Sequence, residues 1–304
     1  MKKPLLISTL LLALSVACFA GSNDTLPPTG TLVSIMSYNI KMLPRGANSF
    51  LKHFPVKRAK LIPAKLIETS PDVIVFQEAF DGVAIRAIKK RLKKMYPYTA
   101  GFDNRKVISY KRAGGVLMFS KYPMKELESI RYSECKGIDC MGNKGAMLVE
   151  VKHPAGTIQV LGTHMQAGGG KELKKSQYAE AGELLRRHEK QGIPQFAAGD
   201  FNTHLDDSTL YVPLLTSLRC VNGDITGDCL YTSDHLLNDM DSYDPNRRKV
   251  IDFVFYKGNG VTPINSRRYV KAFEQPWSKK HKSLSDHNAI VLEINLPPVG
   301  VSAN

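Results

Sequence analysis

Two polar residues that could carry out hydrolytic chemistry stand together in the segment Gly199-Asp200-Phe201-Asn202. Residues 193–196 before it are predicted to form a short buried strand, so Asp200 and Asn202 emerge where that strand ends. Alternate residues of an extended chain point the same way, and both side chains can therefore face one site. A carboxylate beside an amide could hold a nucleophilic water and a negatively charged oxygen. Taken alone, the segment also fits an Asx turn.

Other polar residues lie at the ends of apolar strands. They are Asn39, Glu78, His164, Asp252 and the run Ser285-Asp286-His287. Carboxylate and amide oxygens suit Mg²⁺ better than zinc. Two histidines without neighbouring cysteines indicate acid–base or anion-stabilising groups. Singly, each histidine could be a hydrogen-bonded core residue and Asp252 a strand-end cap, but the recurrence at strand ends favours one shared site.

The elements that must position these residues alternate along the chain. Strands are predicted at 32–38, 72–76, 115–120, 145–151, 157–162, 193–196, 250–256, 266–272 and 289–294. Helices are predicted at 56–69, with Pro63 as a kink or restart, at 83–95 and at 172–190. Several consecutive strands lack a helix between them, so the sheets should be mixed or antiparallel. We expect an α/β fold of two packed sheets with helices outside.

Residues 1–20 are typical of a secretory signal, because two lysines precede an apolar run that ends in small residues. This run is too short to span a bilayer stably, and cleavage is expected after Ala20. Lipid attachment at Cys18 is the alternative, but Ser15, three positions before Cys18, fits a lipoprotein signal poorly. Without internal repeats or linker-like stretches, residues 21–304 are predicted to form a single domain.

The formal net charge of +14 indicates an anionic partner. Nucleic acid and an acidic membrane surface both satisfy it, and a soluble basic exported protein without such a partner is the third interpretation. Charge alone does not separate these three.

Four cysteines remain once Cys18 is set aside, and their spacing forms two local pairs. In a secreted chain this pattern predicts two small disulfide-closed loops, Cys135–Cys140 and Cys220–Cys229. A metal site is the alternative, although neither pair has the two-residue spacing of a zinc knuckle. Four cysteines allow three pairings, so the connectivity is a prediction.

Several short motifs occur in a characteristic order. They are SYNI at 37–40, QEAF at 77–80, GGVLMFSKYP at 114–123, GTHMQA at 162–167, GDFN at 199–202, IDFVFY at 251–256 and SDH at 285–287. Together they resemble the endonuclease/exonuclease/phosphatase superfamily over essentially the whole mature chain. Further motifs resemble the bacterial neutral sphingomyelinases more closely. These are YNIKMLP at 38–44, EAFD at 78–81, NKG at 143–145 and THMQA at 163–167.

The resemblance implies a four-layered α/β sandwich, two packed mixed sheets flanked by helices, and Mg²⁺-dependent phosphodiester hydrolysis, with Mn²⁺ or Co²⁺ as substitutes. Glu78 with Asn39 matches the principal metal position. Asp286 matches either a further metal contact or a residue that contacts the metal ligands. His287 matches the general base that takes a proton from water, and Asp252 the carboxylate that orients it.

The remaining matched residues surround the phosphate. Asp200 and Asn202 match the pair that positions the water and the scissile phosphate. His164 matches the histidine that stabilises the pentavalent phosphorane. Lys144 is expected to contact phosphate, with a surface lysine as the alternative.

The resemblance implies a secreted, monomeric sphingomyelin phosphodiesterase that produces ceramide and phosphocholine. A secreted nuclease of the same superfamily is the first alternative, favoured by the basic charge. The others are a phospholipase C acting on other choline phospholipids and a non-enzymatic binding protein on the same fold.

Two departures from the bacterial enzymes bear on headgroup and membrane specificity. Gly168-Gly169-Gly170-Lys171 stands where those enzymes have an acidic residue, and the segment 273–280 is shorter than their aromatic hairpin. In that segment Trp277 is flanked by basic residues, so it is expected to contact a sphingomyelin-containing membrane. A partly buried core position for Trp277 is the alternative.

Overall fold

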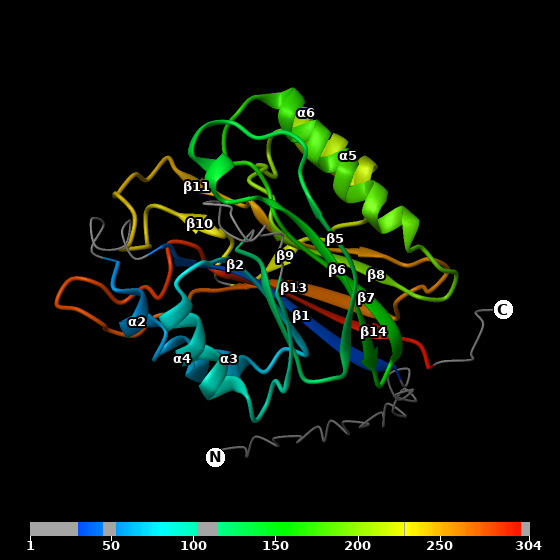
Figure 1. Ribbon diagram of the computed structural model, residues 1–304, viewed down its shortest axis with the longest axis horizontal. Helices are drawn as coiled ribbons and strands as arrows, with labels where there is room; N and C mark the ends of the chain where they lie inside the picture. The colour runs from blue at the N-terminus through cyan, green and yellow to red at the C-terminus, as the bar shows by residue number, and fades with distance from the viewer. Residues whose placement is uncertain (1–29, 45–52, 102–114, 228, 299–304) are drawn as a thin grey trace, which may run out of the picture.

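The structure is a computed structural model that describes residues 30–44, 53–101, 115–227 and 229–298 (Figure 1). The predicted signal segment 1–20 and Cys18 lie outside the described residues, so cleavage and lipid attachment stay predictions. Among the described residues, no helix has the length and apolarity needed to cross a membrane.

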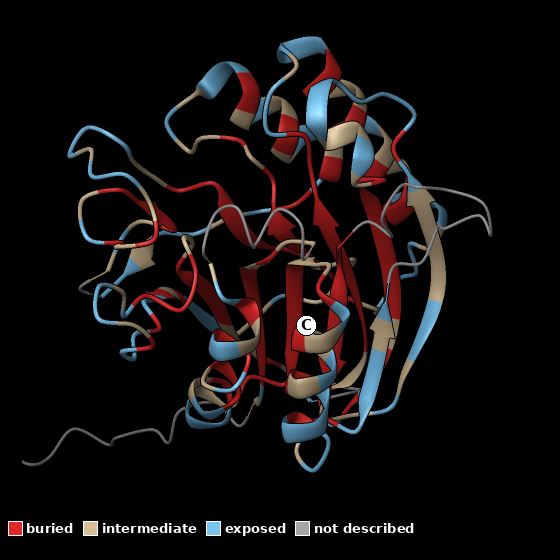
Figure 2. Cartoon of the chain, turned by 60° about the vertical axis from the view of Figure 1, so that its left-hand side comes forward, coloured by how far each residue is buried: buried red, intermediate tan, exposed pale blue. Residues whose placement is uncertain are grey.

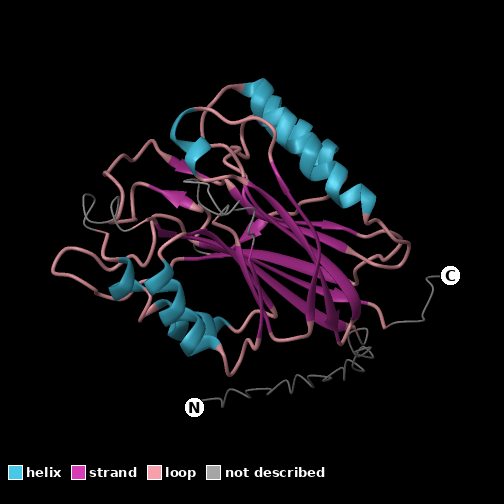
Figure 3. Ribbon diagram, viewed as in Figure 1, coloured by secondary structure: helices cyan, strands magenta, loops and turns pink. Residues whose placement is uncertain are grey.

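Two β-sheets form the centre of the molecule (Figure 3). In the order β3-β4-β2-β1-β14-β13-β9, the larger sheet contains β1 (Thr31–Met42), β2 (Val73–Ala79), β3 (Tyr98–Gly101), β4 (Leu117–Ser120), β9 (Ile225–Thr226), β13 (Asn265–Lys271) and β14 (Ala289–Leu296). In the order β12-β8-β7-β6-β5, the smaller contains β5 (Met124–Arg131), β6 (Gly145–His153), β7 (Gly156–His164), β8 (Gln195–Asp200) and β12 (Asp252–Lys257). A separate ribbon pairs β10 (Ser233–Asp234) with β11 (Arg248–Lys249).

Helices cover the outer face of each sheet (Figure 1). On the larger sheet lie α2 (Pro55–Arg58), α3 (Ile62–Thr69) and α4 (Gly82–Leu92). On the smaller lie α5 (Lys171–Arg187) and α6 (Ser208–Leu218). The 3-10 helix η1 (Gly137–Met141) lies in the loop between β5 and β6. These four layers confirm the predicted sandwich of two packed mixed sheets.

The alternating pattern of β1 explains why the two sheets pack as they do. Val33 and Ile35 face the smaller sheet, whereas Met36 and Tyr38 face the helices. Successive side chains of a strand point to opposite faces, so a strand with apolar residues on both faces can lie between two cores. Each fully buried side chain of this kind contributes about 1.5–3 kcal/mol. Figure 2 shows buried residues running along the strands through the middle of the molecule.

Every predicted strand and helix corresponds to an observed element, and α3 starts beside Pro63 as the predicted restart of the helix. Three larger elements are additional: the strands β3 and β5 and the helix α6. β5 is an edge strand with no buried residue, so its apolar pattern is weak. α6 contains Pro213, which as a sequence signal argues against a helix.

One predicted disulfide is confirmed and the other is wrong. Cys135 and Cys140 are bonded, with their Cα atoms 5.2 Å apart, and the bond closes η1. Cys220 and Cys229 are free thiols. The Cys220 thiol is buried in the core beneath α5 and α6, whereas Cys229 packs against the core between the sheets. The spacing of Cys220 and Cys229 in the sequence does not indicate that their side chains pack against different cores.

The expected membrane contact of Trp277 is also wrong. Only 8% of Trp277 is exposed, and its indole N–H donates to the Ser283 carbonyl at 2.7 Å. The ring stacks on His281 with the two ring centroids 4.9 Å apart. Trp277 is therefore part of the core beside α2, the alternative interpretation of its sequence context.

A buried arginine joins distant parts of the chain near the ends of the central strands. The Arg58 guanidinium donates to the carbonyls of Ile40, Lys41 and Leu284 at 2.6–2.8 Å. Burial lowers the pKa of Arg58 to about 10, so the side chain stays charged at neutral pH. Arg58 thus ties the end of β1 to the segment that leads into β14.

We expect Arg58→Met to lower the free energy of unfolding by about 3 kcal/mol, because it leaves buried carbonyl oxygens without donors. Urea denaturation measures the change. Lys60→Met is the matched control, since Lys60 is exposed in the same region. A loss below 1 kcal/mol for Arg58→Met would show that water satisfies these carbonyls.

Candidate active site

The topology of the two sheets brings the predicted residues to one edge. β1 and β2 are parallel and end side by side, which places Asn39 near Glu78. β7 and β8 are also parallel, and His164 and Asp200 are paired in register at their ends. The antiparallel β12 starts at the same edge, with Asp252 paired to Asp200. Residues far apart in sequence therefore meet because their strands end or begin together.

A histidine–carboxylate pair lies at this edge. His287 Nδ1 is 2.8 Å from Asp252 Oδ2, and its Nε2 is 3.9 Å from Asp200 Oδ2. Asp252 is fully buried, and its backbone N–H donates to the Thr232 hydroxyl at 3.1 Å. The ring therefore has one nitrogen fixed by Asp252 and the other directed toward Asp200, which is the geometry of a base oriented by a carboxylate.

The charge around His287 controls its protonation. Burial of the ring lowers the pKa of His287, but the carboxylates of Asp252, Asp200 and Asp286 outweigh burial and raise the pKa well above its ordinary value. Burial, together with the nearby Asp252 carboxylate, raises the pKa of Asp200 to about 7. Burial and the closeness of these carboxylates therefore both disfavour the fully ionised form of the acidic group.

An amide connects the two halves of the acidic group. Asn39 is fully buried, and its Nδ2 donates to Glu78 Oε1 and to Asp200 Oδ2, both at 3.1 Å. Burial and the Asp286 carboxylate raise the pKa of Glu78. A half-buried carboxylate with raised pKa beside other oxygen donors fits a hard divalent cation. Asp200, Asp252 and His287 also have ligand atoms within 4.8 Å of one another. However, the Asp252–His287 hydrogen bond makes that trio better suited to proton transfer.

Asp286 is occupied by a lysine that is not among the predicted site residues. Lys41 Nζ makes an ion pair with Asp286 and lies 3.8 Å from Asp241 Oδ1. The Ser285 hydroxyl donates to Asp286 Oδ1 at 3.2 Å and to the Asn39 carbonyl at 2.7 Å. Lys41 therefore supplies a fixed positive charge within the acidic site, and metal contact by Asp286 stays a prediction.

Lys144 and His164 form the other side of the site. Lys144 Nζ donates to His164 Nε2 at 3.0 Å and to the Met165 carbonyl at 2.8 Å, and lies 3.1 Å from Asp139 Oδ1. Burial and the Lys144 and His287 charges hold the pKa of His164 well below its ordinary value. His164 is therefore neutral at neutral pH, and the positive charge on this side comes from Lys144. His164 Nδ1 has no hydrogen-bond partner in the described part of the chain.

Asn202 lies beside Asp200, as the GDFN segment predicts. Its backbone N–H donates to Asp200 Oδ1 at 2.9 Å, and its Nδ2 donates to the Met165 carbonyl at 3.0 Å. Asn202 has a left-handed backbone with φ 50°, as do Lys41 (46°) and Glu78 (56°). This conformation is uncommon outside glycine, so its recurrence here marks a backbone shaped to aim side chains.

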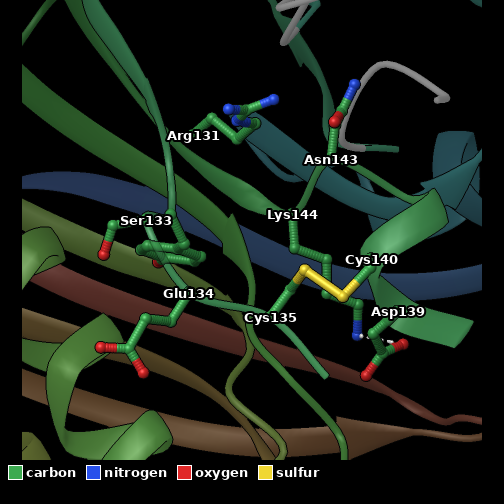
Figure 4. A pocket seen from close by; sticks show the side chains of 9 residues that line it. Arg131, Ser133, Glu134, Cys135, Asp139, Cys140, Asn143 and Lys144 are labelled. Carbon is green, nitrogen blue, oxygen red and sulfur yellow. Dashed lines mark ion pairs between the residues drawn. A yellow bond between two sulfur atoms is a disulfide. The ribbon is translucent and has the colours of Figure 1, made fainter. Parts of the chain in front are cut away.

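A small cavity adjoins the site beneath the disulfide loop (Figure 4). Its lining includes Tyr132, Glu134, Asp139, Asn143 and Lys144. In Figure 4, the Lys144 ammonium points toward Asp139, next to the disulfide. Lys144 thus belongs both to this cavity and to the site beside His164.

Comparison with known proteins identifies the family. The profile described as Endonuclease/Exonuclease/phosphatase family matches residues 36–287. The chain belongs to this family. The predicted assignment to the phosphoric diester hydrolases is thereby confirmed at the level of the family.

The relatives include bacterial phospholipase C and sphingomyelinase C proteins. A "Phospholipase C" of Staphylococcus aureus is 29% identical over 198 residues, which cover 57% of this chain and 58% of that protein. A "Sphingomyelinase C" of Listeria ivanovii is 23% identical over 286 residues, 84% of each chain. A crystal structure of a Staphylococcus aureus beta toxin variant with bound magnesium ions has a TM-score of 0.75 at 24% identity. The match covers 86% of this chain and 99% of the beta toxin chain. The resemblance to bacterial sphingomyelinases is confirmed, and the fold is shared.

We expect Asp252→Asn to lower the pKa of His287, because it removes a carboxylate that stabilises the charged ring. The acid limb of the kcat/KM profile should move to lower pH, and activity should fall about 10²–10⁴-fold because the ring is no longer oriented. NMR titration of the His287 imidazole in metal-free protein measures the pKa directly. Asp206→Asn, at an exposed carboxylate, is the control. An unchanged pKa for His287 would contradict the assigned electrostatics.

Proposed function

We propose that this protein is a secreted, Mg²⁺-dependent phosphodiesterase that hydrolyses sphingomyelin to ceramide and phosphocholine. The observation that carries the proposal is the Asp252–His287 pair placed next to the oxygen-rich Asn39–Glu78–Asp200 group. A base and a cation site at one sheet edge are two components that together can hydrolyse a phosphodiester. The names of the sphingomyelinase C relatives support sphingomyelin as the substrate.

His287 Nε2 accepts a proton from the attacking water, while Asp252 holds the ring through Nδ1. His287 must be neutral to do this, so the carboxylates that raise its pKa also set the lower pH limit of activity. Asp200 and Asn202 position the water and the phosphate.

Opposite the base, Lys144 and His164 face the phosphate oxygens. The Lys144 ammonium supplies positive charge, and the neutral His164 accepts a hydrogen bond from Lys144 at Nε2 and so helps to hold that ammonium in position. Glu78 and Asn39, with Asp286 as a further contact, would hold Mg²⁺, which neutralises charge on the phosphate and on the leaving oxygen.

Secretion is supported by two features of the chain. Residues 1–20 have the pattern of a signal peptide. The Cys135–Cys140 disulfide fits an oxidising compartment. We propose export with cleavage after Ala20 and a single catalytic domain at 21–304 that acts as a monomer on a membrane surface.

Phospholipase C activity on other choline phospholipids is the second candidate, favoured by the name of the staphylococcal relative. Purified mature protein with Mg²⁺ should be assayed in parallel on sphingomyelin, phosphatidylcholine, lysophosphatidylcholine and plasmid DNA. Phosphocholine release from sphingomyelin alone supports the proposal. Preferred cleavage of phosphatidylcholine would overturn sphingomyelin as the substrate. Preferred cleavage of DNA, which the net charge of +14 would allow, would do the same.

We expect His287→Ala to reduce turnover about 10²–10⁴-fold while leaving the melting temperature nearly unchanged, since it removes only the base. Initial rates on the substrate cleaved best measure this. More than a tenth of the wild-type rate would show that His287 is not the base.

Chelation should abolish activity, and added Mg²⁺ should restore it. In Glu78→Gln, the metal affinity measured by calorimetry should fall, because a neutral amide replaces the charged ligand. Glu68→Gln, at an exposed carboxylate on α3, is the control. Full activity after exhaustive chelation would exclude a metal-dependent mechanism.

A further inference from the structure

Two large apolar side chains protrude from the 3-10 helix η1. Ile138 is 83% exposed and Met141 is 63% exposed. They lie on the five residues of η1: Ile138 is inside the loop that the Cys135–Cys140 disulfide closes, and Met141 directly follows Cys140. Single exposed apolar residues are common on protein surfaces, so exposure alone assigns nothing to this pair. Their position relative to the active site is what distinguishes them.

The turn is attached directly to the active site. Asp139, between the two apolar residues, pairs with Lys144 at 3.1 Å and accepts a hydrogen bond from the Ala167 N–H at 2.9 Å. Lys144 in turn donates to His164. The exposed pair is therefore two contacts away from a side chain that faces the scissile bond in the proposed reaction.

The base of the turn is fixed from a second direction. Gln166 Nε2 donates to the Lys136 carbonyl at 2.7 Å, and its Oε1 accepts from the Lys136 N–H at 3.3 Å. Gln177 on α5 donates to the Glu134 carbonyl at 3.0 Å. With these bonds and the disulfide, the turn is held in one conformation before it meets any partner, which lowers the entropic cost of contact.

The exposed residues that lead into η1 include two cations. Lys136 precedes η1 and Arg131 ends β5, and both are exposed, with the exposed Glu134 between them in sequence. Apolar side chains at the tip with basic side chains behind them match the layering of a lipid surface, where phosphate groups lie above the acyl chains. We therefore take a lipid surface as the partner, because the substrate of the proposed function is itself held in one.

We propose that the η1 turn is the element that contacts the lipid interface, with Ile138 and Met141 inserted at the boundary between headgroups and acyl chains. This inference rests on the proposed function, because it explains how the site reaches a phosphodiester held in a bilayer. It gives η1 the role that the sequence suggested for Trp277, which is buried.

The test separates lipid binding from chemistry. In the His287→Ala background, the double variant Ile138→Ser/Met141→Ser and its parent are sedimented with sucrose-loaded vesicles of sphingomyelin and phosphatidylcholine. We expect the double variant to bind about 10-fold or more weakly, since two apolar side chains no longer insert. The matched control is Val212→Ser/Val221→Ser, at two valines 56% and 60% exposed, which should bind like the parent.

With His287 intact, the same double variant should lose activity on vesicles about 10-fold, while its turnover of p-nitrophenylphosphorylcholine in solution stays within about twofold of wild type. Its melting temperature should not change, because both side chains are exposed.

Three results would overturn the inference. The first is unchanged vesicle binding by the double variant, and the second is an equal loss of its activity on the soluble and vesicle substrates. The third is a wild-type dimer, seen by light scattering, that the double variant no longer forms, because the pair would then be a self-association surface. If the wild type binds vesicles through this pair but cleaves no sphingomyelin, the proposed function fails and the interfacial role of η1 stands.

Discussion

The concentration of negative charge where the two sheets end is the constraint on which the site depends. The carboxylates that meet there belong to Glu78, Asp200, Asp252 and Asp286. Burying like charges is costly, and the raised pKa of Asp200 is one expression of that cost. Lys41 and a protonated His287 offset part of it. A divalent cation would stabilise these buried carboxylates further. The local cost of burying the charges and the capacity to bind metal therefore have the same origin.

Much of this arrangement was predictable because it follows from the geometry of strands. Runs of apolar residues locate β1, β2, β7 and β8, and the polar residue after each run locates the edge. Neighbouring parallel strands end at the same edge of a sheet, so Asn39 could be placed near Glu78 and His164 near Asp200, whereas the meeting of the two pairs depends on how the two sheets pack. The roles assigned to these residues by resemblance stay predictions.

Other features depend on information that a linear pattern does not contain. Lys41 looks like any lysine near a strand end, and only the left-handed backbone at φ 46° turns it toward Asp286. Trp277 lies in a segment without periodicity, so nothing in the sequence shows that its ring stacks on His281. The spacing of Cys220 and Cys229 permits a bond that their packing in different cores prevents. Each of these depends on tertiary packing, which overrides local signals.

The position of β14 has a consequence for how the chain becomes active. This strand lies between β1 and β13, so the last strand among the described residues completes the interior of the larger sheet. His287 lies two residues before β14 begins and reaches Asp252 only when that strand is in place. A nascent chain that has emerged only as far as residue 284 lacks both the pairing of β14 with β1 and the His287 side chain. Such long-range closure makes folding slow, and it keeps the candidate site incomplete until β14 has joined the larger sheet.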